Sequence, residues 1–224
     1  MSTIETVTPR FSQRTLGEIA ASLPGSTAVF RRHRLDFCCG GNTTLAAAAA
    51  RKGLSAERIV EELRALDADA AAPAPAETQA LIDHILTRYH EVHRRELPEL
   101  VRLARRVEAV HRDHAQVPAG LADQLEETQR ELEEHMQKEE LILFPAMRNG
   151  GHAMIVSPIT RMRMEHEAHG SRLQRIEELS RGAVAPADAC PTWRALYAGV
   201  RKLCDDLMEH IHLENNVLFP RFGV

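Results

Sequence analysis

The sequence HMQKEELILFP at residues 135–145 has a close copy, HIHLENNVLFP, at residues 210–220. Each copy places a histidine four residues before a glutamate and ends with Leu-Phe-Pro. Residues four apart on an α-helix lie about 40° apart around its axis, so both side chains of a pair project from one face. The pairs are His135 with Glu139 and His210 with Glu214.

A second pair of matching segments precedes these two. His90-Glu-Val-His93 resembles His166-Glu-Ala-His169. His90 lies 45 residues before His135, and His166 lies 44 residues before His210. We infer a duplicated helical hairpin whose two halves are related by a pseudo-two-fold axis.

Apolar residues at helical spacing predict four long helices in this part of the chain. Pro98 lies inside the first helix and is expected to bend it. Ser157-Pro158 is expected to begin the third, with serine as the N-cap and proline at the first helical position. The connections are short, which predicts an all-α, up-down-up-down four-helix bundle. The predicted helices span residues 78–111, from 118 to about 145, from 157 to before 182, and 191 to about 220.

A small helical unit is predicted before the bundle. The segment 67–77 contains two prolines and no bulky apolar residue, so it is interpreted as a semi-extended linker. The predicted domains are therefore 1–66, the linker 67–77 and the bundle 78–224. Within the first domain, helical periodicity covers residues 15–21, 45–51 and 56–66.

Composition narrows the class of protein. With 44% hydrophobic and 27% charged residues the chain can bury a core, and few aromatics beside much Ala, Leu, Glu and Arg favour helix. A net charge of −4 does not indicate a basic, nucleic-acid-binding protein. No apolar run reaches the roughly 18 residues that span a membrane, and no signal peptide is evident, so we expect a cytoplasmic protein. Four cysteines make no disulfide framework.

Four histidines and two glutamates are predicted to converge near the middle of the bundle. At 1.5 Å per residue, His90 and His135 lie within about two turns of the same height, and so do His166 and His210. This set suits two metal ions, each with two histidines, and with both carboxylates and an oxo or hydroxo group as bridges. Nitrogen and oxygen ligands without thiolate favour iron, leave manganese open and disfavour structural zinc. The predicted ligands of this di-iron site are His90, His135, Glu139, His166, His210 and Glu214.

The other histidines receive no ligand role. His111 lies 21 residues beyond His90, about 31 Å along a continuous helix, so it is excluded unless the helix breaks at Pro98. Glu140 is expected to point away from the site. A ferritin-type site would need Glu-x-x-His on two helices, and Glu108-Ala-Val-His111 has no twin. The remaining histidines are interpreted as surface residues or as supports of the ligands: His84, His93, His114, His152, His169 and His212.

Phe37-Cys38-Cys39-Gly40-Gly41 is the distinctive segment of the first domain. Its glycines allow a tight turn that presents a thiol openly. Adjacent cysteines form only a strained, easily reduced disulfide, which suits redox thiols or metal hand-over better than a structural bond. The plain alternative is two small apolar residues that end a helix. Cys190 and Cys204 are interpreted as inert helix residues.

At these residues the chain resembles the Repair of Iron Centres family. The resemblance implies a cytoplasmic, hemerythrin-like di-iron protein with a Cys-Cys-Gly-Gly domain in front. It also implies that the protein repairs iron–sulfur clusters damaged by nitric oxide or peroxide, with a labile di-iron centre that supplies the iron. The partners implied are damaged iron–sulfur proteins. The motifs that carry the resemblance are 36–41, 88–90, 135–136 with 138–140, 165–166 and 213–220.

Two other functions stay open at this point. A di-iron nitric oxide reductase would turn over with an electron donor and keep its iron. A reversible oxygen or nitric oxide carrier or sensor would form a stable adduct and transfer no metal. The cysteine pair favours the repair function, because a simple carrier needs no second domain with thiols. The oligomeric state is open, a homodimer included.

Overall fold

The computed structural model describes residues 11–66, 74–151 and 155–223, and these residues form helices, turns and loops without a named strand. They divide into two compact units. One unit extends to Ala74 and includes His212–Val217, and the other comprises Pro75–Ile211 and Leu218–Val224. The predicted all-α class with a helical bundle is confirmed. In the described part of the chain, no helix is long and apolar enough to cross a membrane.

The first bundle helix is continuous from residue 78 to residue 110. It consists of α5 (Thr78–Ile85), the π-helical turn η2 (Leu86–His90) and α6 (Glu91–Val110). Pro98 lies inside α6 without ending it. The helix therefore carries His90 and His111 at widely separated heights, as the sequence predicted.

The second helix begins at α7 (Leu121–Lys138) and continues through the π turn η3 (Glu139–Leu143) into α8 (Phe144–Arg148). Pro145 lies in the first turn of α8, where its missing N–H has no helical acceptor to lose. The prediction that the helix stops near Pro145 was therefore short by three residues.

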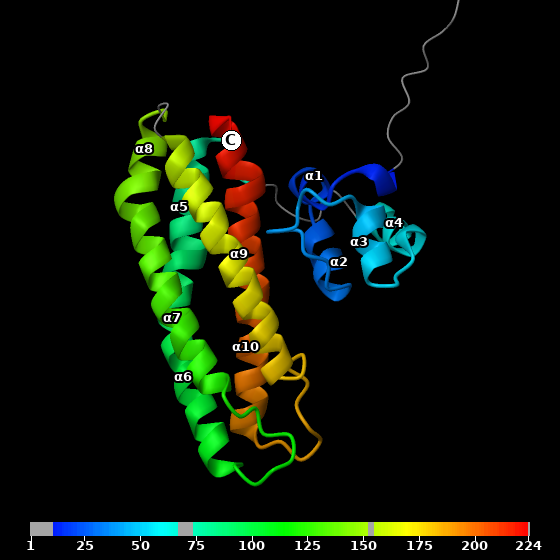
Figure 1. Ribbon diagram of the computed structural model, residues 1–224, viewed down its shortest axis with the longest axis vertical. Helices are drawn as coiled ribbons and strands as arrows, with labels where there is room; N and C mark the ends of the chain where they lie inside the picture. Colours follow the sequence, from blue (N-terminus) through cyan, green and yellow to red (C-terminus); the bar gives the residue numbers. More distant parts are fainter. Residues whose placement is uncertain (1–10, 67–73, 152–154, 224) are drawn as a thin grey trace, which may run out of the picture. The chain divides into compact units, whose positions relative to one another are not determined.

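The third helix, α9, spans Val156–Leu179. Ile155 occupies its N-cap position and makes no side-chain cap bond, so the predicted Ser157 cap was wrong. The fourth helix comprises α10 (Pro191–His212), the π turn η5 (Leu213–Leu218) and the 3-10 turn η6 (Phe219–Phe222). In Figure 1 the helices α5 with α6, α7, α9 and α10 run alongside one another.

Close packing joins α6 to α10. A Cβ added at Gly199 would clash with the end of the Leu100 side chain, which would have to shift to make room. Trp193 and Tyr197 are fully buried one turn apart on α10 and pack edge to face. The apolar interior thus continues along α10 towards His210.

The first unit contains η1 (Phe11–Gln13), α1 (Leu16–Ser22), α2 (Ser26–Arg32), α3 (Leu45–Arg51) and α4 (Ala56–Arg64). Thr15 and Glu18 form a capping box at the start of α1. The helices predicted at 15–21, 45–51 and 56–66 are present within a residue or two, and α2 was not predicted. Residues 67–73 of the predicted linker lie outside the described residues, and the domain boundaries stay a prediction.

Candidate metal centre

The six predicted ligands are buried and lie together. Their atoms form two overlapping groups, and within each group the four candidate ligand atoms lie within 4.8 Å of one another. All six residues are at most 1% exposed. Both carboxylates belong to both groups, which is the arrangement that two ions with shared bridges require. One group contains His90, Glu139, His210 and Glu214, and the other contains His135, Glu139, His166 and Glu214.

Glu139 spans the two groups with one oxygen towards each. Its Oε2 lies 3.4 Å from His90 Nε2, and its Oε1 lies 3.3 Å from His135 Nε2. His90 Nε2 lies 3.1 Å from His210 Nε2, and His135 Nε2 lies 3.1 Å from His166 Nε2. Each pair of ring nitrogens therefore points at a common position, as two imidazoles do when they bind one ion.

Two further carboxylates orient these rings. Glu140 Oε1 accepts a hydrogen bond from His90 Nδ1 at 2.7 Å, and Glu165 Oε2 accepts one from His135 Nδ1 at 3.0 Å. A neutral imidazole that donates through Nδ1 has its lone pair on Nε2, directed into the cluster. The donor set therefore fits cations: nitrogen lone pairs and carboxylate oxygens meet in an enclosed space, where a positive charge offsets their repulsion.

Basic residues keep the two orienting carboxylates ionised. Hydrogen bonds from His90 and then Arg94 lower the pKa of Glu140 to about 2. Hydrogen bonds from His135, Lys138 and Arg161 hold the pKa of Glu165 well below its usual range. Each remains a strong acceptor at neutral pH.

Glu140 makes a contact that the sequence argument did not predict. It belongs to neither metal group, but it reaches the outer nitrogen of a ligand ring on the neighbouring helix. The spacing of residues around one helix showed only that Glu140 and His135 do not project from the same face. The sequence offers one signal for this contact, a second glutamate directly after a predicted ligand.

Three of the four ligand-bearing helices contain a π turn at the site. η2 ends at His90, η3 begins at Glu139 and η5 contains Glu214. A π turn accommodates one extra residue and re-aims the side chains around it, and such turns occur frequently at functional sites. The sequence argument assumed regular α geometry and did not predict these turns.

Two buried histidines border the cluster without belonging to it. His93 packs against the ring of His210, with 5.5 Å between centroids, and His169 packs against His135 at 5.0 Å. Among the described residues, no hydrogen-bond partner is present for His93 Nε2 or for either nitrogen of His169. Burial lowers the pKa of His93 well below its usual range and that of His169 to about 3. Both rings are therefore neutral supports of the ligand rings.

The other histidines lie outside the two groups. His111 follows α6, with Nε2 3.2 Å from Cys190 Sγ and its ring against Trp193. His212 is buried against Phe37 and interacts with Asn216. His84 and His114 are half-buried, and His152 lies outside the described residues.

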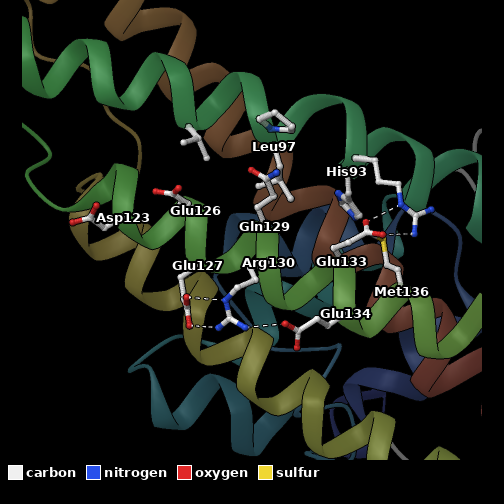
Figure 2. Close-up of a pocket in the computed structure, with 13 residues that line it drawn as sticks. His93, Leu97, Asp123, Glu126, Glu127, Gln129, Arg130, Glu133, Glu134 and Met136 are labelled. Atoms are coloured by element: carbon white, nitrogen blue, oxygen red, sulfur yellow. Dashed lines mark hydrogen bonds and ion pairs between the residues drawn. The ribbon is translucent and has the colours of Figure 1, made fainter.

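A cavity of about 920 Å³ lies between α6 and α7 and reaches His93. Figure 2 shows His93 among the residues that line it, with Leu97 and Met136 nearby. Most of the other lining residues are charged, and Arg130 pairs with Glu127 and Glu134 there. Because His93 packs on His210, the His93 ring separates this cavity from the cluster.

Asp36, Cys38 and Cys39 form a third group of closely spaced ligand atoms. Neither cysteine is in a disulfide; Cys38 is buried and Cys39 is half-buried. The hydrogen bond with Cys39 and burial raise the pKa of the Cys38 thiol, so Cys38 is not an activated nucleophile. The pair does not end a helix, because α2 ends at Arg32. Of the other two cysteines, Cys204 is buried and Cys190 half-buried.

Comparison with known proteins gives matches over both parts of the chain. Residues 81–222 match the hemerythrin HHE cation binding domain, and residues 12–67 match ScdA_N, a domain of unknown function. A probable iron–sulfur cluster repair protein of Haemophilus influenzae is 46% identical over 219 residues, covering 94% of this chain and 97% of that protein. The iron–sulfur cluster repair proteins YtfE of Pectobacterium atrosepticum and Enterobacter sp. strain 638 are 46% and 47% identical, with the same coverage.

These matches confirm the resemblance read from the motifs. The cation-binding domain covers all six buried residues of the cluster, which accords with a metal-binding role for the histidine and glutamate groups. The chain belongs to the family of iron–sulfur cluster repair proteins that carry a hemerythrin HHE cation-binding domain.

Proposed function

We propose that this protein repairs iron–sulfur clusters damaged by nitrosative or oxidative stress, by donating iron from a labile di-iron centre. The observation that carries the proposal is the pair of overlapping histidine and glutamate groups that share both carboxylates. The names of its relatives support the repair task. The partners are damaged iron–sulfur proteins, met in the cytoplasm.

Two iron ions would be held by His90 and His210 on one side and His135 and His166 on the other, with Glu139 and Glu214 shared. When bound, they supply Lewis acidity and one-electron redox change. Only two carboxylates in the groups oppose the combined charge of two ions, since a histidine binds a metal ion through a neutral imidazole. Reduction lowers the positive charge of an iron ion and so weakens its attraction to the carboxylates. Protons compete with the metal for the ligand atoms. Both effects favour release.

The test is iron analysis followed by transfer. Purified protein is reduced anaerobically beside an apo iron–sulfur acceptor, and iron is measured in both proteins after separation. Two irons per chain that move to the acceptor on reduction are expected. Two irons that stay bound while the acceptor remains apo would overturn the donation mechanism.

The cavity at His93 favours a second candidate, a di-iron nitric oxide reductase, because a small molecule bound there would lie one ring away from His210. In that case nitric oxide is consumed with an electron donor and no iron is lost. A stable nitric oxide or oxygen adduct without turnover would instead identify a binding or sensing module.

Cys38 and Cys39 are proposed to serve the repair task as redox or metal-transfer thiols. Replacing both by serine should leave the iron content unchanged and impair repair of a nitric-oxide-damaged cluster protein. Unimpaired repair would reduce the pair to a structural role.

A further inference from the structure

The turn that carries the two cysteines has the spacing of a metal site. Cys38 Sγ and Cys39 Sγ lie 3.6 Å apart, and Cys38 Sγ lies 3.4 Å from Asp36 Oδ1. Two thiolates that bind one tetrahedral ion at about 2.3 Å lie about 3.8 Å from each other. The two sulfurs are therefore already placed for one ion, with the carboxylate on the same side.

The peptide group between Cys38 and Cys39 forms hydrogen bonds with side chains through both its carbonyl oxygen and its N–H. The Cys38 carbonyl accepts a hydrogen bond from Asn215 Nδ2 at 3.0 Å, and the Cys39 N–H donates to Asp36 Oδ1 at 3.0 Å. Asn216 Nδ2 donates to the preceding carbonyl, that of Phe37, at 3.1 Å. The backbone of the turn is thus ordered by contacts that involve no thiol.

The two glycines that follow, Gly40 and Gly41, lie very close to neighbouring atoms of the turn. A Cβ at Gly41 would lie 2.8 Å from the Phe37 carbonyl oxygen and 2.9 Å from Asn216 Oδ1. A Cβ at Gly40 would lie 3.0 Å from the Asp36 carbonyl oxygen. The turn is therefore a tightly built structure with fixed ligand positions.

This construction opposes a Cys38–Cys39 disulfide. The peptide is trans, which sets the two Cα atoms about 3.8 Å apart, below the roughly 4.4–6.8 Å usual for disulfides. Bringing the sulfurs from 3.6 Å to a bond of about 2.05 Å would twist a peptide whose carbonyl and N–H are both held. The geometry favours a persistent dithiol.

We propose that Asp36, Cys38 and Cys39 form a second metal site, which takes one divalent thiophilic cation, with Fe²⁺ as the cellular ion. Binding replaces two thiol protons, which pass to solvent, and no electron is transferred. Two soft thiolates and one hard carboxylate suit Fe²⁺, Zn²⁺ and Co²⁺. Three protein ligands leave a position open, and Cys39 and Asp36 are accessible, so the ion exchanges with solvent or a partner. A role of this site in iron transfer rests on the proposed function, whereas the site itself does not.

The test uses the full-length, iron-loaded protein, reduced and free of oxygen, with Co²⁺ as the probe. Absorption from thiolate-to-cobalt charge transfer should rise with one Co²⁺ per chain. Cys38→Ser and Cys39→Ser should each remove about half of this absorption and weaken binding by at least about tenfold. Asp36→Asn should keep the charge-transfer absorption of both thiolates and weaken Co²⁺ binding by about tenfold. Cys190→Ser, outside the group, is the matched control and should change nothing.

Absence of charge-transfer absorption in the wild type would overturn the proposal, and so would its survival in the Cys38→Ser/Cys39→Ser double variant. A Cys38–Cys39 disulfide found by mass spectrometry in a glutathione buffer would also overturn it. Iron is counted in every sample. If cobalt does not bind at the thiols but the protein retains and transfers two irons, only this inference is refuted. If cobalt binds as expected but no iron is transferred, only the proposed function is refuted.

Discussion

Glu139 and Glu214 are the residues on which the two-ion interpretation depends, because each belongs to both groups. Glu139→Leu or Glu214→Leu removes a carboxylate from both groups while keeping a side chain of similar size. We expect either variant to contain less than about a tenth of the wild-type iron, measured by elemental analysis, with a normal helical circular dichroism spectrum. Glu134→Leu, on the exposed side of α7, is the control. Two irons per chain in either variant would contradict the ligand assignment.

Glu140 and Glu133 allow a matched comparison. Both bind Arg94, but only Glu140 also accepts a hydrogen bond from His90. Glu140→Gln replaces a charged acceptor of the His90 Nδ1 proton by a neutral one, so the ring is oriented less firmly and is less basic. Iron affinity, measured by competition with a chelator, should fall about tenfold or more, whereas Glu133→Gln should change it little. Equal effects would show that Arg94, and not the histidine contact, matters.

The six clustered residues were predictable from sequence for a simple reason. His135 with Glu139 and His210 with Glu214 occur in a repeated frame, and helical angle and rise place them together. Glu140 and Glu165 were not assigned, because their partners lie on other helices and helix-to-helix contacts do not follow from spacing within one helix. The buried positions of His93 and His169 depend on packing in the same way.

At the scale of elements, apolar periodicity predicted the long helices well and the details around the site poorly. The π turns add a residue without breaking the apolar pattern, so η2, η3 and η5 left no separate signal. α2 was not predicted because its apolar residues, Ala28, Val29 and Phe30, are consecutive, so the segment shows no helical spacing. The Ser157 cap failed because α9 starts at Val156, which places the serine inside the helix.

Arg88 in η2 and Asp206 in α10 tie the first helix of the bundle to the last. Arg88 donates two hydrogen bonds to Asp206, and Lys202 donates a third. Burial alone would raise the pKa of Asp206, but these bonds outweigh it and lower the pKa. Arg88 is partly exposed, which screens the pair. Asp206→Asn should therefore destabilise the metal-free protein by about 1 kcal/mol at pH 7 in urea denaturation.

The destabilisation by Asp206→Asn should depend on pH in a defined direction. A carboxyl whose pKa is lower in the folded state stabilises the fold fully above its unfolded pKa of about 3.9. This contribution is lost as the pH falls through the folded value, so the wild type and the variant should converge in acid below about pH 4. Asp113→Asn, on an almost fully exposed residue, should show no such trend. A gap that widens on acidification would contradict the assignment.

At the scale of the whole molecule, the turn η5 serves two purposes. Glu214 belongs to both metal groups, and the next two residues, Asn215 and Asn216, bind the carbonyls of Cys38 and Phe37. The segment His212–Val217 is part of the first compact unit. The sequence argument assigned this segment to the bundle, because spacing along one helix does not show contacts with residues far away in the sequence.

Asn216→Ala tests whether this turn holds the cysteine segment in place. Asn216 donates to the Phe37 carbonyl, interacts with His212 Nδ1 and lies in close packing with Gly17 and Gly41. Losing the amide leaves the carbonyl without this donor and opens space beside the glycines, which should lower the free energy of local opening by about 1 kcal/mol. Since 1 kcal/mol is a factor of about five in population, cleavage between residues 36 and 41 in limited proteolysis should be about five times faster.

Asn149→Ala, which removes a similar amide hydrogen bond to the Pro145 carbonyl, is the control. Iron content should stay normal, because Asn216 belongs to neither group. An unchanged cleavage rate would show that other contacts suffice to order the cysteine turn.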